Sequence, residues 1–129
     1  MNLRESFEAM DDLFAGTGVS AGEIAEAEKT LNCKFAEEYR QYLREFGIAA
    51  VNGHELTGLS SAKRTNVVDV TLEERTREHY EPIPDDWYVV EDANIDDIIV
   101  WQSEAGEIFQ SGADGNFKIC ASLVEYIQL

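Results

Sequence analysis

Residues 19–47, VSAGEIAEAEKTLNCKFAEEYRQYLREFG, decide the fold, because they form the most strongly patterned stretch of the chain. The first part holds apolar residues that recur three to four positions apart, as on one stripe of a helix: Ile24, Ala27 and Leu31. Ser20 followed by Glu23 is typical of a capping box, in which each side chain bonds to the other residue's backbone amide. The stretch therefore begins with a capped amphipathic helix.

A second amphipathic helix follows within the same stretch. Its aromatic and apolar residues lie at spacings of three, four and seven: Tyr39, Tyr42, Leu43 and Phe46. Gly47 then stands where a left-handed residue would end the helix. Cys33 and Phe35 lie in the joint, where apolar side chains would fix the angle between the two helices. The stretch therefore predicts two helices that pack against each other.

Shorter elements are predicted on either side of this pair. Upstream, the apolar residues of 2–14 recur at helical spacing, which predicts a first helix. Downstream, Asn52-Gly53 is a strong hairpin turn signal. It predicts two short strands, over residues 48–51 and 54–59, that pair through this turn.

The remaining chain mixes one helix, several strands and a last helix. Thr71 and Glu74 form a possible capping box, which predicts a helix over 72–80 that ends before two prolines. Ser122 and Glu125 form another, which predicts a short terminal helix. Four strands are predicted by runs of β-branched and aromatic residues: 87–90, 98–101, 107–110 and 117–120.

This order of elements predicts an α+β fold. Helices come first, an antiparallel meander follows, and a helix closes the chain, so no alternating βαβ pattern is present. We expect N-terminal helices packed on a mostly antiparallel sheet, with a short C-terminal helix. About 44% of the 129 residues are hydrophobic, which is enough to bury a core in one domain over residues 1–129.

The pattern of residues 19–47 resembles the opening of the SUKH superfamily, the Smi-Knr-type domain. The resemblance is carried by Ile24, Glu28, Leu31, Phe35, Glu38, Tyr39, Leu43 and Phe46. It continues in the second half, where the family's order of proline, aromatic strand, acidic loop and two further strands is met by residues 84–109. The last matching motif is the S-L-V-E-Y-I run at 122–127. The chain departs from the family where Phe35-Ala36 replaces the usual Leu-Pro, and where Gly47-Ile48-Ala49 replaces Asn-Gly-Gly.

The resemblance implies a binding function. Many bacterial members of the superfamily are immunity proteins, which bind and neutralise a cognate polymorphic toxin that is often a nuclease. The alternative within the same fold is a regulatory or scaffold domain that binds other cellular proteins. Both readings imply a protein partner and a chain that is not an enzyme.

The charge is strongly acidic and unevenly placed. The chain has 26 acidic and 10 basic residues, a formal charge of −16. Residues 1–47 account for −5 and residues 48–129 for −11, so the excess lies in the β-rich half. Nucleic acid and anionic membranes would be repelled, whereas a basic protein would be attracted. We therefore expect a basic protein partner, either a cognate toxin domain or another cellular protein, and we expect neither nucleic acid nor a membrane as a partner.

No catalytic, metal or cofactor motif is present, and we predict no catalytic residue, metal site or cofactor. The nucleophile elbow, P-loop, GxGxxG, HExxH and CxxC patterns are all absent. His54 and His79 are the only candidate bases, and a zinc site that combines them with Cys33 and Cys120 lacks any local ligand pair. The two cysteines are expected to be free, buried thiols. A small hydrolase or metal-dependent enzyme is therefore the least favoured hypothesis.

The acidic run of residues 69–97 has three interpretations. It is a solvated surface, or a docking face for a basic protein, or it holds a cation site at 92–97. The cation site lacks the glycine and glutamate of an EF-hand loop. The candidate partner-binding residues are Asp85, Asp86, Trp87, Asp92, Asp96 and Asp97.

The aromatic residues within this run bear on the same choice. Trp87 and Trp101 either pack in the core or serve as anchors for a partner. Side chains alternate along a strand, so Trp87 and Tyr88 cannot both point into the core, and we expect one of them to be exposed or partly covered.

The N-terminal residues contain no apolar core of a signal peptide, and no run approaches 18 apolar residues. We therefore expect a cytoplasmic, soluble protein.

Overall fold

Helices α2 (Ala21–Leu31) and α3 (Glu37–Phe46) form where the sequence predicts them, in a computed structural model that describes residues 2–129. The capping box is confirmed, since the Ser20 hydroxyl accepts from the Glu23 amide and the Glu23 carboxylate accepts from the Ser20 amide. Every residue of the two predicted apolar faces is buried. Gly47 ends α3 with a φ of 70°, as predicted.

The buried face of α3 is rich in tyrosine, and each phenol has a hydrogen-bond partner. Tyr39 bonds to the Thr57 hydroxyl at 2.9 Å, and Tyr42 donates to the Thr57 carbonyl at 2.7 Å. Tyr88 accepts from the Ala36 amide at 3.0 Å and donates to Gln102. Because these polar groups are paired, the aromatic rings can lie in the core at little cost.

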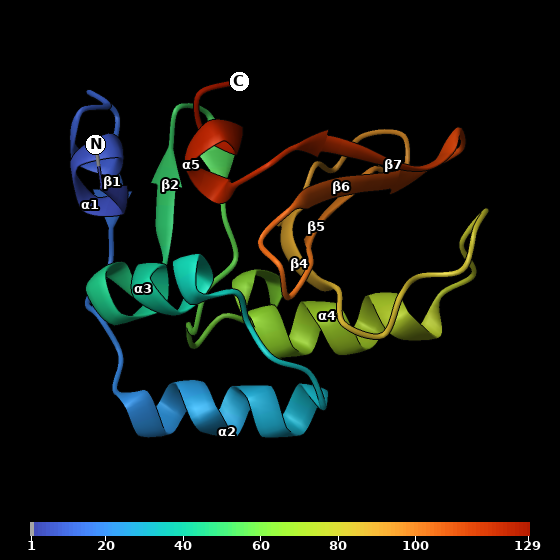
Figure 1. Ribbon diagram of the computed structural model, residues 1–129, viewed down its shortest axis with the longest axis horizontal. Coiled ribbons are helices and arrows are strands. Elements are labelled where there is room, and N and C mark those ends of the chain that lie inside the picture. Colours follow the sequence, from blue (N-terminus) through green and yellow to red (C-terminus); the bar gives the residue numbers. More distant parts are fainter. Residues whose placement is uncertain (1) are drawn as a thin grey trace.

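The strands form two antiparallel sheets (Figure 1). The smaller sheet has the order β1-β2-β3, built from β1 (Phe14–Ala15), β2 (Ala49–Val51) and β3 (His54–Glu55). The larger sheet has the order β4-β5-β6-β7, built from β4 (Tyr88–Asp92), β5 (Ile99–Gln102), β6 (Ile108–Gly112) and β7 (Gly115–Cys120). The Thr57 amide joins the two by donating to the Val90 carbonyl at 2.8 Å.

Both faces of the larger sheet are covered. Tyr88 and Val90 point into the main core with α2 and α3, while Val89 and Trp101 point the other way into a second cluster, which includes Val70 of helix α4 (Val67–Thr76). Figure 1 shows α4 lying beneath this sheet. The expectation that Trp87 or Tyr88 is exposed or partly covered is wrong: they do face opposite sides, but each side is buried.

Two predicted helices differ from the observed ones. Helix α1 (Leu3–Glu8) is shorter than predicted, because the chain turns and Phe14 enters β1. Helix α4 begins at Val67, five residues earlier than predicted, since Asn66 accepts from the Val68 and Asp69 amides as its N-cap. Thr71 therefore does not cap the helix. It lies within the helix, and its hydroxyl accepts a hydrogen bond from the Val89 amide.

The terminal helix is also tied to the rest of the chain. Helix α5 (Leu123–Tyr126) has Ser122 as its N-cap, as predicted. Its first amides, those of Leu123 and Val124, donate to the Glu38 carboxylate of α3 at 2.7 and 3.1 Å. The predicted return strand over 54–59 is shorter than expected, since β3 ends at Glu55.

The observed architecture confirms the predicted α+β class with a short C-terminal helix. A short 3₁₀ helix, η1 (Lys63–Thr65), precedes α4. In Figure 1, α1 and β1 lie at the left end of the molecule, whereas the segment after α4 and the β6–β7 turn lie at the right end. Among residues 2–129, no helix combines the length and apolar character that crossing a membrane requires.

Candidate functional site: an acidic cleft at the end of the larger sheet

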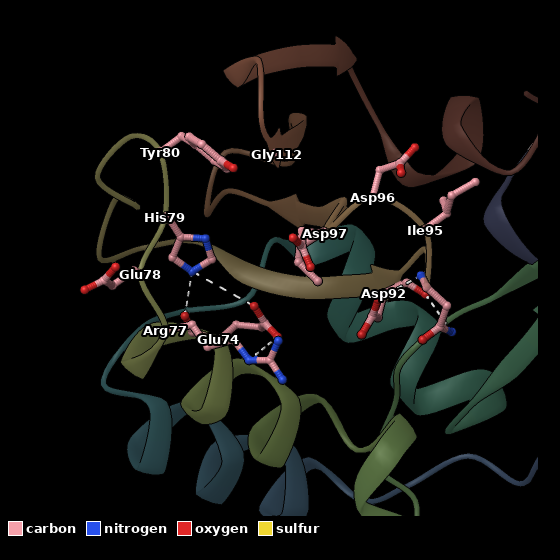
Figure 2. Close-up of a pocket in the computed structure, with 12 residues that line it drawn as sticks. Glu74, Arg77, Glu78, His79, Tyr80, Asp92, Ile95, Asp96, Asp97 and Gly112 are labelled. Carbon is pink, nitrogen blue, oxygen red and sulfur yellow. Dashed lines mark hydrogen bonds and ion pairs between the residues drawn. The ribbon is translucent and has the colours of Figure 1, made fainter.

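A cleft opens where the segment after α4 meets the β4–β5 connection. Its volume is about 710 Å³, and Figure 2 shows its walls. His79, Glu78 and Tyr80 lie on one side, while Asp92, Ile95 and Asp96 lie on the other. Most of the lining side chains that bear charge are carboxylates: Glu74, Glu78, Asp92, Asp96 and Asp97. We call this cavity, with all the residues that line it, the acidic cleft.

The β4–β5 connection has a backbone that suits its acidic sequence. Asn94, Asp96 and Asp97 adopt left-handed conformations, with φ of 57°, 51° and 57°. Asn and Asp tolerate this region better than other residues with a side chain. The Asp92 carboxylate accepts from the Asn94 amide at 2.9 Å, which closes the first turn of the loop.

The carboxylates of Asp96 and Asp97 are free. Both residues are exposed, and within residues 2–129 neither side chain has a hydrogen-bond or ion-pair partner. An exposed carboxylate that is not paired with a cation adds its negative charge to the potential around the site. These two side chains are therefore available to a partner.

The base of the cleft holds a buried carboxylate. Glu74 is 4% exposed; its Oε2 lies 3.4 Å from Arg77 Nε, and its Oε1 lies 4.0 Å from His79 Nε2. Burial raises the pKa of Glu74, and the charges of Arg77 and His79 offset this only in part. Glu74 thus belongs to the packed floor of the cleft, whereas Asp96 and Asp97 belong to its open rim.

Apolar side chains stand beside the acidic rim. Tyr80 is 72% exposed and Ile95 is 60% exposed, and both line the cleft. Phe117 lies in an adjoining hollow that shares Asp96 and Asp97 with the cleft. Exposed apolar groups within a charged surface are typical of sites that bind another protein.

The structure separates the residues that the sequence grouped as a partner site. Asp92, Asp96 and Asp97 come together in the acidic cleft. Asp85 lies in a neighbouring hollow that shares Arg77 and His79 with it. Asp86 lies apart from the cleft and accepts from the Glu104 amide at 3.2 Å, at the β5–β6 turn.

Trp87 is a core residue. It is 6% exposed and stacks on Phe109 with ring centroids 4.4 Å apart. Trp101 is fully buried as well, and its indole donates to the Ser111 hydroxyl at 2.8 Å. The hypothesis that tryptophans anchor a partner is therefore wrong, because neither ring is accessible.

Sequence reasoning did not select Tyr80 and Ile95. The predicted helix extended to Tyr80, but α4 ends at Thr76, so Tyr80 lies in the connection that faces the β4–β5 loop. The signal that was present is an aromatic residue directly before a Glu-Pro pair and an isoleucine inside an acidic loop. Apolar residues in such polar loops have no core to enter.

The remaining reactive groups are engaged in packing. His54 bonds to the buried Glu91 carboxylate at 2.9 Å and to the Leu129 carbonyl at 3.3 Å, and His79 bonds to the Glu74 carbonyl at 2.7 Å. Both cysteines are free thiols, as expected, but they are half-buried and not fully buried; their partial burial raises the pKa of both thiols. Across residues 2–129, no group of three or more His, Cys, Asp or Glu residues is arranged to hold a metal ion.

Comparison with known proteins places the chain in a family. The model of a family described as SMI1-KNR4 cell-wall, SUKH_5, matches residues 3–127, which is nearly the whole chain. A search of curated proteins found no match to the chain.

Proposed function

The chain belongs to the SUKH superfamily, in its SMI1-KNR4 cell-wall family, and from this premise we propose that it is an immunity protein. In this proposal it is a non-catalytic binding protein that neutralises a cognate bacterial toxin by direct protein–protein contact, in the cytoplasm. The observation that carries the proposal is the acidic cleft, where free carboxylates and exposed apolar side chains occur together.

The two kinds of side chain supply different parts of the binding free energy. The exposed carboxylates of Asp96 and Asp97 attract a basic surface over several ångströms and raise the rate of encounter. Tyr80 and Ile95 offer apolar area that a partner can remove from water, which slows dissociation. A nuclease toxin fits this description, because the groove in which a nuclease binds the phosphate backbone of its nucleic-acid substrate is basic.

The neighbouring carboxylates support the same proposal. Glu78 and Asp92 are exposed beside Asp96 and Asp97 in the cleft lining, and Asp114 lies in the adjoining hollow. Among the described residues that line the cleft, the basic side chains are Arg77 and His79, and Arg77 is paired with Glu73 and Glu74. The net field at the rim is therefore negative.

The non-catalytic part of the proposal rests on the histidines. His54 is held at both ring nitrogens by hydrogen bonds, and the ring of His79 packs against Trp101 with centroids 5.9 Å apart. A general base needs a free nitrogen within reach of a substrate proton. Both ring nitrogens of His54 and the Nε2 of His79 are already used in hydrogen bonds, which does not favour either ring as a base.

The experiment uses the toxin domain encoded beside the gene for this chain. We expect a complex whose affinity falls steeply between 50 and 500 mM salt, together with loss of toxin activity. Asp96→Lys/Asp97→Lys should weaken binding at low salt, whereas the control Glu26→Lys/Glu104→Lys, with the same charge change elsewhere, should not. Binding of a different cellular protein through the cleft, without toxin neutralisation, would instead favour a regulatory or scaffold domain. Absence of binding to any neighbouring toxin at low salt would contradict the proposal.

A further inference from the structure

The two sheets have outer edges that are treated differently by the rest of the chain. At β7, the Asn116 amide donates to the Glu81 carboxylate at 3.0 Å, and the Asn116 side chain donates to the Pro82 carbonyl at 2.9 Å. A Cβ on Gly115 would collide with the same carboxylate. The segment after α4 therefore occupies this end of the β7 edge and blocks another strand from pairing there.

The outer edge of β1 has no such cover. The Gly16 amide donates to the Ile48 carbonyl at 2.8 Å, and Phe14 and Ala15 stand opposite Ala50 and Ala49. Hydrogen-bonding residues alternate along an antiparallel strand, so the amide and carbonyl of Ala15 point away from β2. Within residues 2–129, no hydrogen bond reaches that side of Ala15.

The residues that form this edge, 13–19, are apolar or uncharged. Residues 14–17 are all exposed, and Phe14 reaches 80%, the largest value among the exposed large hydrophobic side chains. Residues 13–19 contain no charged residue and no proline, which are the usual guards of an exposed edge. An open edge with an exposed aromatic ring is suited to accept an extended strand.

We propose that the outer edge of β1 binds an extended, basic segment of another protein, which pairs with Ala15 and packs an apolar side chain on Phe14. Charge selects this occupant over a second copy. The chain carries −16, and the segment that leads into β1 has four carboxylates, Glu5, Glu8, Asp11 and Asp12, against one cation, Arg4. Asp12 accepts from the Asn52 and Gly53 amides, which leaves Glu5 and Asp11 exposed and without an ion pair among residues 2–129. Arg4 is already paired with Glu8 and Glu45.

This surface goes beyond the proposed function, because it lies at the opposite end of the molecule from the acidic cleft (Figure 1). The two sites can therefore be tested separately. A partner that uses both would contact the chain through a charged rim at one end and through backbone hydrogen bonds at the other.

The test uses a peptide of alternating lysine and valine as the probe, with an alternating glutamate and valine peptide as its control. We expect the basic peptide to slow hydrogen exchange of the Ala15 amide, measured by NMR, and the acidic peptide to leave it unchanged. Ala15→Pro removes the outward amide without removing a bond to β2, and should weaken binding about tenfold. Phe14→Ser should also weaken it, whereas the control Leu72→Ser, at an exposed apolar residue outside both sites, should not reduce protection of Ala15.

Three results would overturn the proposal. One is unchanged exchange of Ala15 at saturating basic peptide, which needs no variant and so does not depend on whether Ala15→Pro folds. Another is equal protection by the acidic peptide. The third is a dimer of the chain in light scattering at low salt that Phe14→Ser abolishes, which would assign the edge to a second copy.

Discussion

The carboxylates of the helical pair and those of the acidic cleft have the same chemistry but different surroundings. In α2 and α3, Glu28 accepts from the Phe35 amide and from Arg40, and Glu38 accepts from the first amides of α5 and from Gln102. At the cleft rim, Asp96 and Asp97 have no such partner among residues 2–129. A carboxylate surrounded by N–H donors holds the fold together, and one that lacks them is available to a partner.

This difference explains how formal charge relates to function here. The −16 charge counts structural and free carboxylates alike, so it indicates an attraction to basic partners without locating it. The place of that attraction is found from the hydrogen-bond partners of each carboxylate, because only a carboxylate without such partners is free to bind a basic protein. The comparison therefore predicts which substitutions change stability and which change binding, and the following experiments test that division.

The largest effect is expected for Trp87→Ala. Trp87 packs against Phe109 and Trp101 in the second core cluster, and removing it should lower the free energy of unfolding by about 3–5 kcal/mol. Urea denaturation measures this. A loss below about 1 kcal/mol would mean that Trp87 is exposed in solution, as the sequence alone allowed.

The next effect concerns the structural carboxylates. Glu38→Ala leaves the Leu123 and Val124 amides without their acceptor and should cost about 2–3 kcal/mol. Asp97→Asn, which removes the charge and keeps a side chain that tolerates the left-handed backbone of this position, should change stability by less than about 0.5 kcal/mol. Equal losses for the two variants, measured by the same urea titration, would remove the distinction between the two regions.

A smaller effect is expected at the apolar rim, and it is seen in binding only. Tyr80→Ala should weaken the complex with the toxin domain about tenfold, since an exposed aromatic ring beside charged groups is a favourable anchor. The free energy of unfolding of the Tyr80→Ala variant should match that of the unmodified chain. Leu72→Ala, at an exposed apolar residue outside the cleft lining, serves as the control and should leave affinity unchanged. Isothermal titration calorimetry gives both affinities.

The smallest effect is a pH dependence at Glu74. Burial raises the pKa of this carboxyl above its ordinary value of 4.5, so the folded chain binds its proton more tightly than the unfolded chain does. Its favourable contribution is present below pH 4.5 and is lost as the pH rises through the raised pKa. Glu74→Gln should therefore gain stability relative to the unmodified chain between pH 4 and pH 7. Urea titrations at pH 4, 5.5 and 7 measure the trend, and the opposite slope would mean that Arg77 and His79 outweigh burial.

The helical pair could be predicted because its signals are local. A capping box, a 3.6-residue period and a terminating glycine all lie within residues 19–47. The strand positions of the second half followed from runs of β-branched and aromatic residues that are separated by turn residues. Helix α4 was placed too late because its first residues, Val67, Val68 and Val70, are β-branched and show no clear helical stripe.

The candidate site could be predicted only in part, because it depends on tertiary contacts. The sequence located the acidic loop with Asp92, Asp96 and Asp97. It did not reveal that the segment holding Tyr80 folds against this loop. Alternation placed Trp87 and Tyr88 on opposite faces of the strand, yet no local signal indicated that α4 covers the face of the sheet on which Trp87 lies. Burial on both sides is a property of the whole fold.

The central claim is that the free carboxylates of the cleft steer a basic partner to the chain. It is tested most directly by the association rate constant of Asp96→Lys/Asp97→Lys with the toxin domain, measured by stopped flow over a range of salt concentrations. We predict a rate at least tenfold below that of the unmodified chain at 50 mM salt, and a difference that disappears near 500 mM. Equal rates at low salt, with both proteins folded, would contradict the account.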